Sequence, residues 1–466
     1  MALLVGVLSG CASHRYATDP AVAVSQDCDR QFIRWRNWVD TAGHYDAQDW
    51  SPPGFPYLRV DRFLAGFDLN GLSPRQRHDW LARAHQQAVV AWQFEAEGGL
   101  DEISQWLTGL RDCGSRAISE LESEPELWHR LVASVEVPDS YSTPSQVIGV
   151  YPLVEPVVRW RAGVTMGELA AQFGDYGPRG GWRTYRPVPA ATNGPDRLQV
   201  YPVDSLGVPV LNDPLRSELF LRHAPGWRIE TQDSFDLPGV PGRQLDGRLQ
   251  FRPEPVVFTH LSFTHFNGRI LPQLNYVIWF SGRPAQGWLD IYAGALDGFV
   301  WRVTLDSHGR PLIYDTVHPC GCYHQWLLAD GGLVANDSIE YETEQLWLLG
   351  SIPAESHRSP LLALSAGEHQ LVGVSVDQSP APDGRVQNYR LVPLDSLRGR
   401  SYAGGRLYDD DGLIGGTERL ERFLLWPTGV ASAGAMRQWG HHAVSFVGRR
   451  HFDDPHLLDR YFLAPQ

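Results

Sequence analysis

The sequence contains no lysine, so all 40 of its basic residues are arginines, against 54 aspartates and glutamates. Without a lysine amine the chain cannot form the Schiff base of pyridoxal phosphate enzymes or supply the lysine of a Walker A phosphate loop. The formal net charge of −14 argues against nucleic acid as a main partner, because proteins that bind phosphate backbones present positive charge. Lysine-dependent enzyme classes are therefore excluded, and no nucleic-acid partner is expected.

Long apolar runs and internal repeats are also missing. After the first residues, no run approaches the ~20 apolar residues that a membrane-spanning helix needs. No repeat of roughly 20 to 50 residues indicates a propeller or a solenoid. Even so, 43% of the 466 residues are hydrophobic and 11% are aromatic, enough for a sizeable core. We therefore expect a globular chain of two or three domains.

The chain begins with an apolar stretch that ends in small residues before a cysteine, MALLVGVLSGC. Leu8-Ser9-Gly10-Cys11 resembles the lipobox of bacterial lipoproteins, in which signal peptidase II cleaves before a cysteine that carries lipid. The resemblance implies that residues 1–19 are a signal and tether and that Cys11 is lipidated. The membrane is then a partner through the lipid anchor, and we expect the body to face the periplasm from the outer membrane.

The other four cysteines are Cys28, Cys113, Cys320 and Cys322. An even number of cysteines in an oxidising compartment indicates disulfide pairs. Cys28 and Cys113 both fall in segments with a helical pattern, so we expect them to be bonded. Such a bridge closes a loop of about 85 residues, worth on the order of 4–5 kcal/mol by loss of chain entropy in the unfolded state. The alternative is two unpaired buried thiols.

Residues 20–137 have the pattern of a helical domain. Ser73-Pro74 is typical of a helix start, with a capping serine and a proline in the first turn. Apolar residues then recur at helical spacing, at Trp80, Leu81, Ala84, Ala88 and Trp92. A second periodic run follows from Leu100 to Leu121.

After Pro138 the helical pattern gives way to short β-branched and aromatic runs separated by turn residues. Val256–Phe263 and Leu274–Phe280 are expected to pair across Asn267-Gly268, and Phe299–Leu305 is expected to pair with Arg310–Val317. The segment from residue 178 to 195 has the composition of a long surface loop. The sequence therefore predicts an α+β protein: a helical N-terminal domain, followed over residues 138–466 by a larger, mainly antiparallel β domain.

Four metal-ligating side chains alternate in one short segment, His318, Cys320, Cys322 and His324. On a straight strand they would share one face but span roughly 20 Å, so Pro319 and Gly321 would have to bend the chain. Cysteine and histidine are ligands of zinc and copper, so a zinc or copper site is expected here. Ligands more distant in the sequence would complete the site. We expect these to be His260 and His265, with His441 and His442 as further candidates. Asp315 would orient an imidazole without binding the metal itself.

Other interpretations of this segment stay open. Cys320-Gly321-Cys322 is also compatible with a small strained disulfide of redox function, with a structural bridge, or with inert buried thiols. The functions that follow are a metal-dependent hydrolase or oxidoreductase, a non-catalytic metal-binding or scaffolding lipoprotein, and a periplasmic thiol–disulfide protein. The stretch from Asn275 to His324 resembles uncharacterised proteobacterial proteins, a resemblance that implies no activity. The sequence identifies no substrate and leaves open whether the protein is an enzyme.

Overall fold

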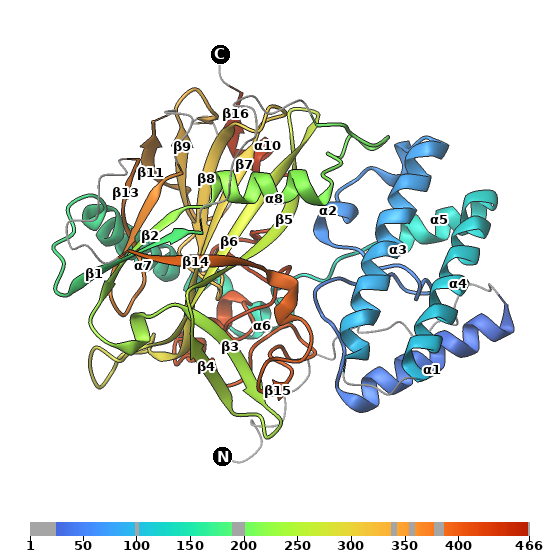
Figure 1. Cartoon of the computed structure of the whole chain (residues 1–466), viewed down its shortest axis with the longest axis horizontal. Coiled ribbons are helices and arrows are strands. Elements are labelled where there is room, and N and C mark those ends of the chain that lie inside the picture. The colour runs from blue at the N-terminus through green and yellow to red at the C-terminus, as the bar shows by residue number, and fades with distance from the viewer. Residues whose placement is uncertain are drawn as a thin grey trace. The chain divides into compact units, whose positions relative to one another are not determined.

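The computed structural model describes residues 25–97, 102–188, 201–336, 343–353, 359–376 and 386–464. The lipobox, including Cys11, lies outside these residues. The chain forms two compact units, one containing residues up to 139 with 409–412, the other containing 140–408 and 413–466. The first is helical and the second is built on a large sheet (Figure 1). The expected α+β class is confirmed.

The first unit consists of helices whose starts carry clear local signals. Ser73 caps α3 in a capping box with Gln76, as the Ser73-Pro74 signal indicated. Inside the unit, the buried Glu95 of α3 accepts hydrogen bonds from Arg59 at 2.5 Å and from the Trp35 indole at 3.0 Å. The elements are α1 (Gln26–Ala42), α2 (Arg62–Ala65), α3 (Pro74–Ala96), α4 (Glu102–Ser123), α5 (Pro125–Ser134) and a 3₁₀ turn at Leu69–Gly71.

A disulfide between Cys28 and Cys113 joins α1 to α4, with the two Cα atoms 5.5 Å apart. Both cysteines are fully buried. The expectation that these two residues pair is confirmed in the structure. Because the bond links residues 85 positions apart, it restrains most of the helical unit in the unfolded state.

The second unit opens with helices, where the sequence had indicated strands from residue 138 onward. These are α6 (Thr143–Ile148), α7 (Tyr151–Gln172) and, after the first strand, α8 (Asp213–His223). The expectation failed at α7 because its prolines and β-branched valines, which are typical of turns and strands, obscure the helical pattern. Leu153, Val157 and Trp160 form a stripe that faces solvent, each 63–75% exposed, and Pro156 lies inside the helix.

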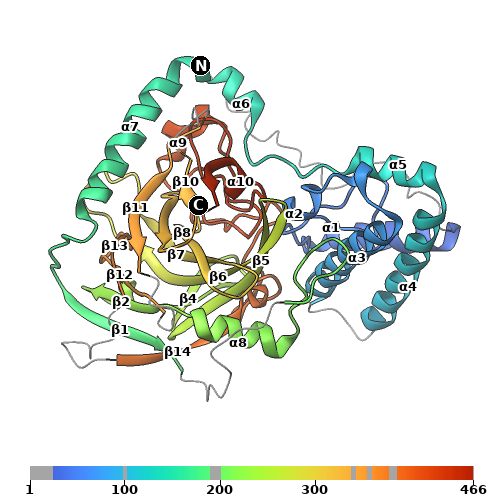
Figure 2. The same ribbon diagram turned by 90° about the horizontal axis from the view of Figure 1, so that it is seen from above.

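The main sheet has eleven strands in the order β11-β9-β8-β7-β6-β5-β14-β1-β2-β12-β13. It curls into a nearly closed barrel (Figure 2). Neighbours are antiparallel from β5 through β9, whereas β14 runs parallel to both β5 and β1. The strands are β1 (Gly181–Pro187), β2 (Gly226–Thr231), β5 (Val256–Phe266), β6 (Arg269–Arg283), β7 (Gly294–Leu305), β8 (Pro311–Val317), β9 (Gln325–Ala329), β11 (Trp347–Ile352), β12 (Leu361–Leu364), β13 (Leu371–Ser375) and β14 (Val386–Pro393).

Both expected hairpins are present, β5–β6 and β7–β8. In the first, Asn267 and Gly268 take positive φ angles of 50° and 71°, as a tight two-residue hairpin turn requires. Residues 178–195 were expected to be a surface loop, but Gly181–Pro187 form β1, between β14 and β2, and residues 189–195 lie outside the described part of the chain. Only the hydrogen-bonded neighbours of that segment, which lie far away in sequence, identify it as a strand.

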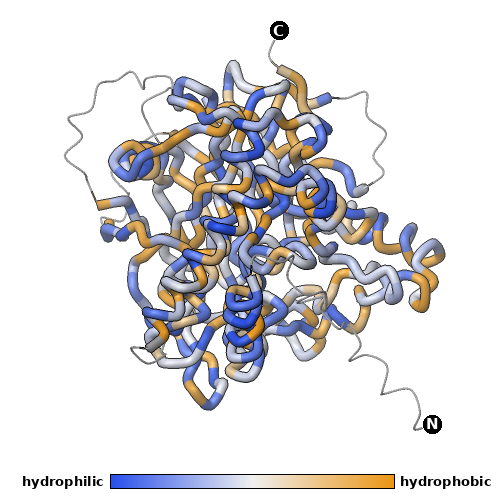
Figure 3. Tube along the Cα trace, turned by 90° about the vertical axis from the view of Figure 1, so that its right-hand side faces the viewer, coloured by the Kyte–Doolittle hydropathy of each residue, from blue (hydrophilic) through white to orange (hydrophobic). Residues whose placement is uncertain are grey.

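Apolar residues from all eleven strands fill the inside of the barrel, with Trp227, Tyr276 and Trp301 among the largest. The outer face of β5–β8 packs against a second cluster that includes Met436 and Trp439 from the C-terminal segment. The alternation of hydrophobic and hydrophilic residues along the trace can be followed in Figure 3. Smaller elements complete the unit: β3 (Gly239–Gln244), β4 (Leu249–Pro253), β10 (Val334–Ala335), β15 (Gly404–Gly405), β16 (Phe462–Leu463), α9 (Arg422–Leu425), α10 (Leu457–Tyr461) and 3₁₀ turns at Ser234–Asp236, Leu394–Leu397 and Trp426–Thr428.

Among the described residues, no helix combines the length and the apolar character needed to cross a membrane.

Candidate functional site

The two remaining cysteines lie on the tight connection between β8 and β9, which we call the dithiol loop (residues 318–324). The N–H of His318 donates to the Cys322 carbonyl at 3.0 Å, and the N–H of Gly321 donates to the His318 carbonyl at 2.7 Å. Gly321 has a φ of 92°, and a Cβ there would clash with the carbonyl oxygen of Ala443. Glycine is therefore required at this position, and the bend that the sequence suggested is present.

Cys320 and Cys322 are free thiols that contact each other. Cys320 is buried and Cys322 is partly exposed, and the Cys322 N–H donates to the Cys320 sulfur at 3.4 Å. A hydrogen bond from the Cys322 thiol lowers the pKa of Cys320, against the effect of burial and with help from the positive charge of Arg419. The same hydrogen bond and burial raise the pKa of Cys322 well above its usual value. The pair therefore releases one proton readily and holds the second.

Charged side chains from the C-terminal segment surround the two sulfurs. Arg437 donates from Nε to the Cys320 carbonyl at 3.1 Å. Burial raises the pKa of Glu421 to about 7, although Arg419 opposes this. When ionised, Glu421 raises the pKa of both thiols, whereas Arg419 lowers it. The protonation of the dithiol thus depends on residues about a hundred positions away in sequence.

His318 points away from the sulfurs and into a chain of buried carboxylates and imidazoles. Its Nδ1 lies 3.5 Å from Asp297, which also bonds His369 Nδ1 at 2.8 Å, and the other ring nitrogen of His369 is 3.3 Å from Asp236. All four side chains are at most 2% exposed. These side chains attach the dithiol loop to β7 and to the turn between β12 and β13. Because they are buried, a substrate does not reach them.

The pKa values of this chain differ according to how many partners each group has. Burial lowers the pKa of His318, and the single carboxylate of Asp297 does not reverse the effect. Burial acts in the same direction on His369, but two carboxylates outweigh it and raise the pKa. Burial would raise the pKa of Asp297, yet hydrogen bonds from both histidines hold it well below its usual value. Of the two histidines, His369 therefore binds a proton more readily than His318.

His324 points to a different carboxylate, on the outer face of the barrel. Its Nε2 lies 2.9 Å from Asp315 Oδ2, and Arg302 donates to both oxygens of Asp315 at 2.8 and 2.5 Å. Burial lowers the pKa of His324 to about 4 despite the nearby carboxylate. Asp315 thus orients the imidazole of His324, and its expected role beside a metal ligand stays a prediction.

Of the six expected metal ligands, the structure brings only Cys320 and Cys322 together. The ring of His260 packs on Trp439 with 4.4 Å between centroids, and His265 stacks on His456 at 4.7 Å. Over the described residues, no three histidine, cysteine, aspartate or glutamate side chains form a group that could hold a metal ion. The zinc or copper site stays a prediction.

Sequence reasoning missed the residues that control the thiols, Arg419, Glu421 and Arg437. They lie on irregular C-terminal segments, and their pattern in the sequence does not distinguish them from other surface charges. Asp297 and His369 were missed for the same reason. Proximity in sequence identified the cysteines, whereas their surroundings depend on the tertiary fold.

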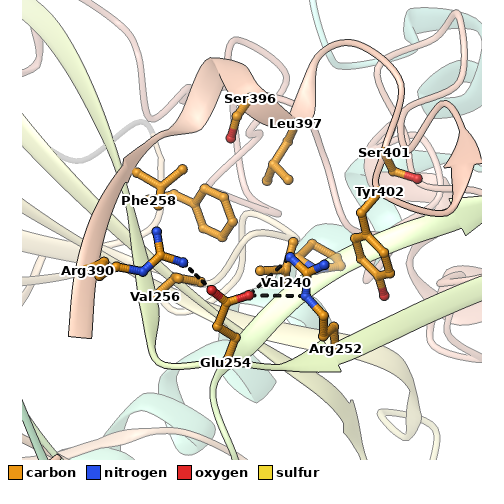
Figure 4. A pocket seen from close by; sticks show the side chains of 12 residues that line it. Val240, Arg252, Glu254, Val256, Phe258, Arg390, Ser396, Leu397, Ser401 and Tyr402 are labelled. Carbon is orange, nitrogen blue, oxygen red and sulfur yellow. Dashed lines mark hydrogen bonds and ion pairs between the residues drawn. The ribbon is translucent and has the colours of Figure 1, made fainter. Parts of the chain in front are cut away.

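The second unit also has an open cavity of about 210 Å³ that the dithiol loop does not line. Its apolar floor includes Val256, Phe258 and Leu397. At its mouth Glu254 pairs with both Arg252 and Arg390 (Figure 4). Because one carboxylate already neutralises much of the charge of the two arginines, the cavity offers little to an anionic ligand.

Comparison with known proteins gives no match: no family model, curated protein or solved structure is significantly similar to the chain. Function is therefore inferred from the geometry of the site.

Proposed function

We propose that the protein is a thiol–disulfide protein of the bacterial envelope, anchored through lipid on Cys11, with Cys320 and Cys322 as its reactive pair. The observation that carries the proposal is the contact between two free thiols, two residues apart on a tight loop, one of them partly exposed. Reactive cysteines are partly accessible and have a stabilised thiolate. The resemblance of Leu8-Ser9-Gly10-Cys11 to a lipobox supports an oxidising compartment, where such a pair meets disulfides.

The reaction is a two-step exchange. Cys322, the partly exposed residue, passes its proton to the Cys320 thiolate as its sulfur attacks one sulfur of a substrate disulfide, and the other substrate sulfur leaves as a thiolate. Cys320 then attacks the Cys322 sulfur, which breaks the mixed disulfide and releases the second substrate thiolate. The substrate disulfide gains two electrons, the protein pair loses two, and the two thiol protons pass to the products. The reverse sequence oxidises a substrate dithiol.

The surrounding residues have separate roles in this scheme. Arg419 favours the thiolate, which the hydrogen bond between the two sulfurs places on Cys320, and the same hydrogen bond is the path by which the Cys322 proton reaches Cys320. His318 does not act as the base, because its ring bonds Asp297 in a buried site. His318 instead positions the loop.

The reactive pair is tested by counting thiols and by trapping the intermediate. Native protein is equilibrated in increasingly oxidising glutathione buffers. The thiols of Cys320 and Cys322 should both become resistant to alkylation over the same range of buffers, and reduction should restore them. Cys320→Ser should accumulate a mixed disulfide on Cys322, because the resolving sulfur is missing. Cys322→Ser should accumulate much less, since Cys320 is buried. If both thiols stay alkylatable under oxidising conditions, the proposal fails.

Metal analysis separates this function from the expected metal site. Protein purified without chelator should contain well under one zinc or copper per chain. Stoichiometric metal, lost in both Cys320→Ser and Cys322→Ser, would support the metal-dependent function instead, because thiolates bound to metal do not exchange freely. His260→Ala and His265→Ala should leave the metal content unchanged under the present proposal.

The anchor is tested by labelling cells with a radioactive fatty acid. Wild type should incorporate label and Cys11→Ser should not. Equal labelling of both chains, or of neither, would contradict the anchoring while leaving the dithiol chemistry unaffected.

A further inference from the structure

The second unit exposes an apolar surface formed by α6, α7 and the α9 segment. Large hydrophobic residues are usually buried, yet ten of them here are 39–75% exposed. They belong to the end of α6, the first half of α7, and residues 420–426. We call this surface the apolar patch; its members are Val147, Ile148, Val150, Leu153, Val157, Trp160, Leu420, Phe423, Leu424 and Trp426.

The three elements that carry the apolar patch pack against one another. The 3₁₀ turn at Trp426–Thr428 contacts α6, α7 and α9. Gln146 donates from its amide to the Thr428 carbonyl at 2.8 Å, and the Ser142 N–H donates to the Gly429 carbonyl at 2.7 Å. Figure 2 shows α9 between α6 and α7 at one side of the barrel. The elements that carry the ten side chains therefore lie next to one another.

This region is large for a surface that faces water. With half or more of most of these side chains exposed, the apolar area is on the order of 1,000 Å², against roughly 300–600 Å² for the largest patch on a typical monomer. In α7 the exposed residues Leu153, Val157 and Trp160 lie at helical spacing, so the helix turns a complete apolar stripe outward. Burial of such a stripe against an apolar partner is favourable.

The charge around the apolar patch is opposite in sign to that of the whole chain. Four arginines adjoin it, on α7, on α9 and on the turn bonded to α6: Arg159, Arg161, Arg422 and Arg449. The same elements carry Glu168, Glu155, which pairs with Arg159, and Glu421, which is buried. The local formal charge is therefore about +1, four arginines less three glutamates, in a chain of −14.

We infer that the apolar patch docks on the surface of a bilayer that contains anionic lipid. Trp160 and Trp426 are suited to the headgroup boundary, where amphipathic aromatic rings collect, and Leu153, Phe423 and Leu424 would enter the acyl region. The adjacent arginines would meet lipid phosphates. A soluble partner of opposite charge explains the arginines equally well, but the proposed anchor on Cys11 favours the membrane, because it keeps the protein beside one.

The inference rests on the proposed lipid anchor only because the anchor keeps the protein close to a membrane. Residues 12–24 separate Cys11 from the first described residue, and at most ~3.5 Å per residue they reach about 45 Å. A tether of that length keeps the body at a high effective concentration near the bilayer, so that even weak docking is populated. Docking then fixes the orientation of the second unit relative to the membrane.

Vesicle flotation tests the docking without the lipid anchor. The chain is produced from Ala12 onward, which removes the apolar leader and Cys11 but keeps every described residue, and is mixed with phosphatidylglycerol–phosphatidylethanolamine vesicles. The quadruple variant Ile148→Ser, Leu153→Ser, Phe423→Ser and Leu424→Ser should bind at least tenfold more weakly than the parent chain. Binding of the parent should also fall severalfold on neutral phosphatidylcholine vesicles.

The matched control changes equally exposed apolar residues elsewhere in the same unit, Leu245→Ser and Val203→Ser, and should bind like the parent chain. Equal thermal unfolding of the parent and both variants establishes that the fold is intact.

The docking is overturned if the parent fails to float, if the quadruple variant floats as well as the parent, or if the parent binds neutral vesicles equally well. Sedimentation that shows a dimer dissolved by the quadruple variant would overturn it in favour of a second copy. Fatty-acid labelling of Cys11 tests the anchor independently of vesicle binding. A failure of the anchor can therefore be distinguished from a failure of the docking.

Discussion

At the scale of single residues, Glu421 is expected to tune the reactivity of the thiols. Its own pKa, about 7, places its ionisation near neutral pH, and its negative charge raises the pKa of both cysteines. Glu421→Gln should therefore lower the pKa of the pair and speed alkylation of Cys322 by roughly three- to tenfold at pH 8, since a tenfold change corresponds to one pKa unit. Below about pH 6 the two proteins should react alike, because Glu421 is then protonated.

Measured rates of iodoacetamide modification between pH 5.5 and 9 check this prediction. Glu418→Gln is the matched control, because Glu418 lies on the same segment but is exposed, and it should leave the profile unchanged. A profile of Glu421→Gln identical to that of wild type would contradict a role for this carboxylate.

At the scale of elements, the buried contact of Arg302, Asp315 and His324 joins β7, β8 and β9. Arg302 and Asp315 are at most 2% exposed, so removing one charge leaves the other unpaired in the interior. Asp315→Ala should lower the free energy of unfolding by about 3–5 kcal/mol. Arg310→Ala should cost at most about 1 kcal/mol, because Arg310 pairs with Asp306 on the surface of the same hairpin.

Urea unfolding of both variants, followed through tryptophan fluorescence, measures the difference. The double variant Arg302→Met with Asp315→Leu should recover much of the loss, since it removes both buried charges together. Equal losses for Asp315→Ala and Arg310→Ala would show that burial does not control the strength of these pairs.

At the scale of the whole molecule, buried neutral histidines should make the protein sensitive to acid. Burial lowers the pKa of His442 to about 3 and that of His324 to about 4, whereas an unfolded histidine titrates near 6.5. Between these values the unfolded chain binds more protons, so stability falls as the pH drops from about 6.5 toward 4. Each histidine contributes on the order of 3 kcal/mol to this loss.

The raised pKa of His369 acts in the opposite direction. The contribution of His369 to the free energy of unfolding is complete below about pH 6.5 and is lost as the pH rises through the pKa that His369 has in the folded state. Unfolding free energies at pH 7 and pH 4.5 measure the net effect, which we expect to be a loss in acid. His442→Gln should flatten the dependence. A profile of wild type that is flat from pH 7 to 4.5 would contradict the prediction.

The sequence predicted the features that depend on neighbours along the chain. The start of α3 has its cap and proline in adjacent positions, and the β5–β6 hairpin has Asn267-Gly268 at its turn. The pairing of Cys28 with Cys113 followed from counting cysteines and from the helical pattern around both. The dithiol was identified because its two cysteines are two residues apart.

The features that sequence analysis missed depend on tertiary neighbours. β1 pairs with β14, about 200 residues later, and nothing within β1 indicates this. α7 escaped notice because its prolines and β-branched valines are typical of turns and strands, whereas in the structure they lie within a helix. His318 and His324 were expected to converge on a metal, yet in the structure each bonds a buried aspartate, Asp297 or Asp315, on a neighbouring strand.

The place of β14 in the sheet has a consequence for how the protein acquires its structure. This strand comes from residues 386–393, yet it lies between β5 and β1 and pairs with both. Until it is inserted, the barrel consists of two half-sheets, each with an open edge, and such long-range parallel pairing forms slowly. A chain crossing a membrane from its N-terminus would have to keep both edges open until nearly five-sixths of its length had emerged. We therefore expect chains stopped before Val386 to be cleaved rapidly by protease within the strands that the full-length barrel protects, and equal resistance would contradict this order of assembly.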